Sequence, residues 1–228
     1  MPNNFLKRIV NTRQPRNVCD PDLLNLKTEI IKHIDDIKDK TQLRALFSNT
    51  TNSDEVKIKE FIARAQIVWI CATLDYYLHK VQSICMFKIY NKQIAQTQYC
   101  NKINVPLNIV IDLSNGNSTT FIEGVYDSLK NYSYINMKSI NSIASLIGVN
   151  IKQLAKIMYP TELNNNKAYK RLEKKLEEIF ERRHIIVHKM DITDGGQQQV
   201  VTDILVDEYI STIEEFILKI HEGIENLF

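Results

Sequence analysis

The feature that most constrains this chain is an arginine inside the apolar stripe of its most regularly patterned segment. Apolar residues recur in this segment at three- and four-residue spacing, as in a helix buried along one face: Leu172, Leu176, Ile179, Phe180 and Val187. Arg183 lies in the middle of that stripe. A guanidinium stays charged and is costly to bury alone, so an anion has to meet it. The pattern predicts a site at Arg183, completed by a protein carboxylate or by the phosphate of a ligand.

Composition favours an all-α fold. The chain has 228 residues, enough for one domain with a real core, and its 44% hydrophobic content is typical of a globular protein. It contains only six glycines and five prolines, which favours helices over β-structure. There is no long uncharged apolar run, and the first residues lack the apolar core of a signal peptide. We therefore expect a soluble, cytoplasmic protein that does not bind a membrane.

Charge and cysteine usage narrow the possible functions. The formal net charge is +2 at pH 7, so any contact with nucleic acid has to come from a local group of cations. The four cysteines show no C-x-x-C spacing, and Cys71 and Cys85 fall in apolar helical sequence. Such cysteines are expected to be reduced thiols packed as small hydrophobic groups. We expect no metal and no other cofactor.

We interpret the whole chain, residues 1–228, as a single domain with four parts. A basic N-terminal segment and a helix occupy residues 1–53, and a long core helix follows in residues 54–97. Residues 98–165 form an insertion of loops and short helices. A motif helix and a C-terminal helix complete the chain in residues 166–228.

Apolar periodicity and capping residues place the individual helices. The long helices are expected over residues 23–46, 55–96, 166–190 and 201–227, and short ones over 121–129, 140–146 and 151–158. Residues 107–113 are expected to form a short extended or helical piece within a loop. The predicted fold is a helical bundle in which short extra helices are inserted between two pairs of core helices.

A second charge lies on an apolar line of the long core helix. That line ends at Asp75 and begins with four apolar residues at helical spacing: Phe61, Ala65, Val68 and Ala72. We expect Asp75 to point into the same interior as Arg183, within about 4 Å of it or joined to it through one water. The two helices that carry these charges should therefore pack against each other.

The spacing of Arg183 and His188, with four residues between them and His184 directly after the arginine, resembles the Arg-x4–6-His signature of the HEPN superfamily. The helix around residues 61–78 resembles the upstream helix of the RiboL-PSP-HEPN branch, with Arg64 near its start and Asp75 near its end. The resemblance covers roughly residues 55–95 and 165–225. It implies a HEPN-like helical bundle, and many members of the superfamily are metal-independent endoribonucleases.

The residue types fit RNA cleavage without a metal. The 2′-hydroxyl of the RNA supplies the nucleophile, so the protein has to move protons and hold the phosphate. We assign proton transfer to His188 and phosphate binding to Arg183, with products ending in a 2′,3′-cyclic phosphate and a 5′-hydroxyl. The supporting residues are Asp75, His184 and Arg182, and the RNA-binding residues are Lys189, Arg64 and Tyr77.

The helix geometry and the resemblance together indicate a homodimer. Residues five apart on a helix differ by about 140° in azimuth and about 7.5 Å in height, so Arg183 and His188 do not share one face. HEPN relatives pool two motifs in one cleft, and a two-fold dimer is implied here. The resemblance also implies an RNA substrate, cellular or from a phage and including tRNA, and a role as a toxin or phage-defence effector. Regulation by another protein, such as a cognate antitoxin, would accompany that role.

Two other functions remain open at this point. The motif could belong to a non-catalytic HEPN-like module that binds RNA or protein and dimerises. A metal-binding protein is the other alternative, because four possible ligands fall on one helical face: Glu181, His184, His188 and Asp191. Asp75 is as well suited to orienting Arg183 as to taking part in the chemistry.

Overall fold

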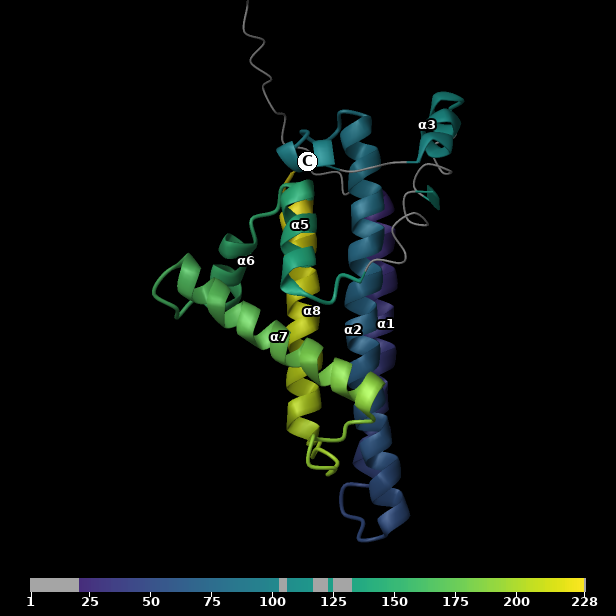
Figure 1. Ribbon diagram of the computed structural model, residues 1–228, viewed down its shortest axis with the longest axis vertical. Coiled ribbons are helices and arrows are strands. Elements are labelled where there is room, and N and C mark those ends of the chain that lie inside the picture. The colour runs from purple at the N-terminus through teal and green to yellow at the C-terminus, as the bar shows by residue number, and fades with distance from the viewer. Residues whose placement is uncertain (1–20, 103–105, 117–122, 125–132, 228) are drawn as a thin grey trace, which may run out of the picture.

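The computed structural model describes residues 21–102, 106–116, 123–124 and 133–227 (Figure 1). Within these residues lie seven α-helices, one 3-10 helix and no strand. An isolated antiparallel bridge between Ile192 and Gln198 is the one β-type pairing found there. The all-α class predicted from the sequence is confirmed.

The first two helices run side by side along the longest axis of the molecule (Figure 1). α1 (Pro21–Leu46) packs one apolar face against α2 (Ser53–Tyr90), and that face consists of Leu23, Leu26, Ile30, Ile34 and Ile37. The side chain of Asn52 caps α2 by accepting a hydrogen bond from the Asp54 amide at 2.9 Å. In the part of the chain that the structure describes, no helix combines the length and the apolar character that crossing a bilayer requires.

α8 (Asp203–Glu225) lies beside α1 and α2 and completes the long part of the bundle. Its buried face includes Val206, Ile210, Ile213, Phe216, Ile217 and Ile220. Arg44, near the end of α1, reaches across to the first turns of α8, where it meets Asp203 at 3.2 Å and also Asp207. This ion-pair cluster joins the first described helix to the last one.

Short elements connect α2 to the motif helix. They are η1 (Gln98–Lys102), α3 (Leu107–Ser114), α5 (Met137–Ile147) and α6 (Ile151–Met158). The short helices predicted over 140–146 and 151–158 are therefore present, and the piece at 107–113, which could have been extended or helical, is a helix. Most of the helix predicted over residues 121–129 and nearly all of the basic N-terminal segment lie outside the described residues.

α7 (Asn165–Lys189) carries the motif and runs obliquely across the bundle (Figure 1). It starts beside α6 and ends against α2, with the side chain of Asn164 capping its first turn. Its bounds differ by one residue at each end from the predicted range of 166–190. The predicted packing of the core helix against the motif helix is confirmed.

Three predicted inward-facing residues, Val187, Phe61 and Ala72, are exposed instead. Val187 was expected to continue the apolar stripe of α7, but 44% of it is open to solvent, because the last turns of α7 extend past the core. Phe61 was expected on an inward line of α2 and is 73% exposed. The buried face of this part of α2 lies on a neighbouring line through Ala63, Ile67, Ile70 and Leu74.

Candidate active site at the end of helix α7

The end of α7 is held differently from the rest of the helix. Its earlier turns bury Leu172, Leu176, Ile179 and Phe180, whereas no residue from Glu181 to Met190 is fully buried. Apolar packing therefore fixes the first two thirds of α7 and leaves the motif at a margin between core and solvent. Polar contacts therefore help to position the last turns, together with Ile186, which packs against the core.

Arg183 is half-buried, and its guanidinium has no carboxylate partner among the described residues. Its Nε atom is buried and lacks a hydrogen-bond partner. The charge lies close to Cys71 on α2. Burial raises the pKa of the Cys71 thiol to about 12, while the positive charge of Arg183 opposes that rise and the negative charge of Asp75 adds to it. Arg183 is thus a cation at the α2–α7 contact whose anion is not supplied by the described protein.

The expected direct ion pair between Asp75 and Arg183 is wrong. One oxygen of Asp75 accepts a hydrogen bond from the Tyr134 amide at 2.6 Å, and the other lies 3.8 Å from Nε2 of His79. The ring of His79 in turn packs 4.3 Å from that of Tyr134. Asp75 therefore anchors the chain around Tyr134 to α2, because it gives a buried amide its acceptor. A link to Arg183 through one water remains a prediction.

Asp191 is the carboxylate that two other arginines share. Its side chain is fully buried, and its Oδ2 accepts from Nε of Arg64 at 2.7 Å and from Nη2 of Arg182 at 2.9 Å. Both arginines also donate to the carbonyl of Gln199, at 3.0 and 3.5 Å, and Arg182 reaches the carbonyl of Val200 at 3.1 Å. Arg64, predicted to bind RNA, and Arg182, predicted as a supporting residue, are thus both engaged by Asp191, and those two roles remain predictions.

The backbone at Asp191 makes this arrangement possible. Met190 and Asp191 adopt φ values of 52° and 62°, in the left-handed region that residues with a side chain rarely enter. Their amides turn back to the carbonyl of Ile185, closing the helix, and the Gln199 amide donates to the carbonyl of Asp191 at 2.9 Å. Two successive strained residues cost about 1–3 kcal/mol each, so the surrounding contacts must hold them.

His188 and His184 are both exposed, with ring centroids 4.6 Å apart. They therefore form a pair of imidazoles on the solvent side of α7, whereas Arg183 faces α2. The predicted separation of Arg183 and His188 onto different faces agrees with their different exposure. The four-ligand metal alternative loses Asp191, which is buried with two arginines, and no group of three or more metal-binding side chains occurs among the described residues.

The two remaining predicted RNA contacts differ. Lys189 is exposed at the last position of α7, with Asp194 3.5 Å away. Tyr77 is fully buried, and its hydroxyl lies 3.3 Å from Nδ1 of His221 on α8, so the predicted contact between Tyr77 and RNA is wrong. Burial raises the pKa of the Tyr77 hydroxyl well above its usual range. Tyr77 belongs to the core between α2 and α8.

An apolar groove of about 570 Å³ opens beside the motif, between the first half of α2 and the end of α7. Three large side chains that line it are widely exposed: Phe61 at 73%, Trp69 at 47% and Met190 at 75%. Arg64 and Ile186 also line it, so the groove adjoins both the Asp191 cluster and the turns that carry the motif. So much apolar surface gathered in one place is typical of a binding face.

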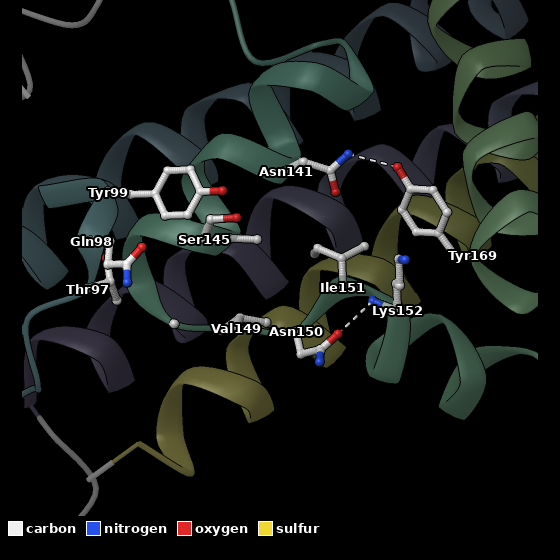
Figure 2. Close-up of a pocket in the computed structure, with 12 residues that line it drawn as sticks. Thr97, Gln98, Tyr99, Asn141, Ser145, Val149, Asn150, Ile151, Lys152 and Tyr169 are labelled. Carbon is white, nitrogen blue, oxygen red and sulfur yellow. Dashed lines mark hydrogen bonds between the residues drawn. The ribbon is translucent and has the colours of Figure 1, made fainter. Parts of the chain in front are cut away.

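A second hollow, of about 580 Å³, lies near the start of α7 (Figure 2). Tyr99, Asn141 and Tyr169 line it, and the Asn141 amide donates to the Tyr169 hydroxyl at 2.8 Å. Tyr169 precedes Arg183 by fourteen residues, a rise of about 21 Å along the helix. This hollow is separate from the motif.

Sequence reasoning missed two parts of the site. Asp191 was considered only as a possible metal ligand, and its position directly after the motif helix is the one signal that could have drawn attention to it. The groove was missed because Phe61 and Val68 were placed on an inward line. Both errors concern contacts between segments far apart in the chain.

Comparison with known proteins supports the resemblance seen in the motif. A family model described as RiboL-PSP-HEPN matches residues 22–226, nearly the whole described chain. No curated protein and no solved structure shows significant similarity to the chain.

Proposed function

The chain belongs to the RiboL-PSP-HEPN family, and from that premise we propose that it is a metal-independent endoribonuclease. Its substrate would be cellular or phage RNA, including tRNA. The protein would act in the cytoplasm as a toxin or phage-defence effector. Arg183 and His188 are the proposed catalytic residues.

The observation that carries this proposal is the missing anion at Arg183. The other arginines of the described chain are paired with acids: Arg44 with Asp203 and Asp207, Arg64 and Arg182 with Asp191, and Arg171 with Glu162. Arg183 has no such partner there, although its Nε is buried. A guanidinium fork matches two phosphate oxygens, so a scissile phosphate is an anion of the right shape and charge.

The proposed reaction transfers the phosphate to the neighbouring 2′-oxygen. A neutral imidazole of His188 takes the proton of the 2′-hydroxyl as the O2′–P bond forms, and Arg183 stabilises the charge that builds on the phosphate oxygens. The P–O5′ bond then breaks, and a protonated imidazole supplies the proton that the leaving oxygen needs. His184, whose ring lies beside that of His188, is the nearest second imidazole in the same chain.

We further propose a homodimer formed through the apolar groove. Phe61, Trp69 and Met190 expose enough apolar surface to favour association, and they lie beside the turns that carry the motif. In a two-fold dimer the same patch meets itself, so the motif ends of both chains would border one cleft. That arrangement would bring the Arg183 of one chain toward the His188 of the other, which a single helix keeps on different faces.

The test is cleavage of total tRNA by the purified protein in EDTA. The wild type should produce fragments with 2′,3′-cyclic phosphate ends, and His188→Ala and Arg183→Ala should produce them far more slowly. Arg171→Ala is the matched control, because Arg171 is an exposed arginine of the same helix paired with Glu162. Full activity of His188→Ala would sink the proposal, as would loss of wild-type activity in EDTA with recovery on added zinc.

A second function, a non-catalytic module that binds RNA or protein, is favoured by the same groove. Its exposed apolar side chains suit a protein partner, including a cognate antitoxin or another regulatory protein. A wild-type protein that retards tRNA in a gel and leaves it uncut would favour this function over cleavage.

A further inference from the structure

The last turns of α7 bear the proposed catalytic groups, although these turns have little apolar packing beyond that of Ile186 against the core. Every residue from Glu181 to Met190 is exposed or half-buried. The ion pairs that tie this end of α7 to α2 form a cluster in which Asp191 joins Arg182 of α7 to Arg64 of α2. Asp191 follows His188 by three residues, so this cluster lies within one turn of the imidazole.

We propose that Asp191 is a positioning residue for the motif, an inference that rests on the proposed ribonuclease function. Through Arg64 and Arg182 it fixes the rotation of the last turns of α7 relative to α2. That rotation decides whether His188 points to solvent while Arg183 faces the α2–α7 contact. Asp191 does not touch the substrate and is not a catalytic residue.

The charges of the cluster give Asp191 a second effect on the same site. Arg182 and Arg183 are neighbours, and either could bind a phosphate if both were free. Asp191, Gln199 and Val200 engage the guanidinium of Arg182, so Arg183 is left as the arginine available to an anion. Asp191 thereby selects which arginine the phosphate meets.

The cluster also depends on an unusual backbone conformation. Asp191 reaches its buried position only because Met190 and Asp191 both take left-handed backbone conformations. The segment after Asp191 then closes the loop, with the Thr193 amide donating to the Gln197 carbonyl at 2.8 Å and the Ile192–Gln198 bridge beside it. In many proteins, residues other than glycine that adopt a strained left-handed conformation are found at functional sites.

The experiment compares Asp191→Asn with Asp207→Asn in the full-length chain. Asp207 is the matched control because it is also a carboxylate paired with a buried arginine, Arg44, on helices that carry no proposed catalytic residue. Asp191→Asn should lower the kcat for tRNA cleavage about tenfold or more and change KM by less than about twofold. Asp207→Asn should leave both constants unchanged at a temperature at which both variants are folded.

A readout independent of cleavage follows the imidazoles directly. Ring proton resonances of His184 and His188 in NMR spectra should shift in Asp191→Asn and stay in place in Asp207→Asn. Ring resonances that do not shift in Asp191→Asn, or equal losses of kcat in the two variants, would overturn the inference. If the wild type does not cleave RNA, the proposed function fails, and the ring resonances still decide whether Asp191 positions the motif.

A second variant covers the case in which Asp191→Asn does not fold. Arg182→Lys keeps the positive charge but loses the fork that contacts Asp191, Gln199 and Val200 together. Arg182→Lys should reproduce both the loss of kcat and the shift of the histidine ring resonances. Wild-type values in Arg182→Lys would count against the inference.

Discussion

Two arginine sites of this protein contrast in how their charge is balanced. At the junction of α1 with α8, Arg44 is 1% exposed and meets both Asp203 and Asp207, with Thr41 3.2 Å away. At the end of α7, Arg183 is only half-buried and meets no carboxylate of the described chain. The Nε atoms of both are buried without a partner, so the difference lies in the acids around the fork.

The contrast shows which cation has a purely structural role. Where protein carboxylates occupy the fork of a buried guanidinium, no site is left for a ligand, and removing one partner is costly because it leaves a buried charge unpaired. An arginine at the edge of the core without a partner is instead ready for an external anion. The following predictions test this distinction, from the largest expected effect to the smallest.

Removing the carboxylate at Asp191 should turn two paired arginines into unpaired ones. Asp191→Ala should lower the free energy of unfolding by about 3–5 kcal/mol, because Arg64 and Arg182 would keep buried charges without their shared partner. Urea unfolding followed by circular dichroism measures the change. A loss below about 1 kcal/mol would show that these arginines reach other anions or water.

Arg183→Ala should separate activity from stability. We expect cleavage of tRNA to fall by about 10²–10³, since a phosphate-binding cation is lost. The free energy of unfolding should change by less than about 1 kcal/mol, because no buried carboxylate is left behind. Single-turnover cleavage and a urea titration of the same sample measure both. A variant that is strongly destabilised would reveal a protein partner for Arg183 and remove the contrast with Arg44.

Arg44→Ala should show the opposite behaviour. We expect a destabilisation of about 2–4 kcal/mol from the emptied volume and the lost charge-assisted hydrogen bonds. Asp203 and Asp207 reach solvent, which keeps the loss below that of Asp191→Ala. Below its melting transition the variant should cleave RNA at the wild-type rate. A lowered kcat in folded Arg44→Ala would mean that the two sites are coupled.

The apolar groove beside Arg183 should control association. Trp69→Ser should shift the protein from dimer toward monomer in sedimentation at micromolar concentration, because about half of the side chain is exposed on the groove. Tyr99→Ser, in the second hollow near the start of α7, is the control and should leave the dimer intact. A wild type that sediments as an active monomer would contradict the dimer.

The interior of the bundle should respond to acid through His221. Burial lowers the pKa of this imidazole below its usual 6.5, so the folded state favours the neutral ring. The unfolded chain takes up a proton at a higher pH than the folded one, and the free energy of unfolding should therefore fall as the pH drops below about 6.5. His221→Gln should reduce this slope in urea titrations between pH 7 and pH 5. An unchanged slope would place its origin in other groups.

The sequence predicted the helices well because their signals are local. The α7 range differs from the predicted one by a residue at each end, since its capping asparagine and its apolar spacing are both written within the segment. The packing of α2 against α7 also followed from their patterns. The pattern did not identify which face of α2 is buried. Apolar residues surround almost the whole circumference of α2, so several of its faces look equally suited to burial.

The partners of the charged groups could not be predicted from spacing. Asp75 and Arg183 do lie in the same region, where both charges act on Cys71, yet Asp75 bonds to the Tyr134 amide instead. Tyr77 is one position from the half-buried Tyr76, and that single step moves it from the surface to full burial. Such outcomes depend on how the helices cross.

The sequence by itself determined the all-α class, the positions of the helices and the place of the Arg183 and His188 motif at a helix end. Periodicity and capping are properties of neighbouring residues, so they can be read along the chain. The tertiary structure alone decided that Asp191 binds Arg64 and Arg182, that Arg183 is left without an acid, and that Phe61 and Trp69 border a groove. Those facts depend on distances between α2 and the end of α7, which are more than a hundred residues apart in sequence and meet only when the helices pack.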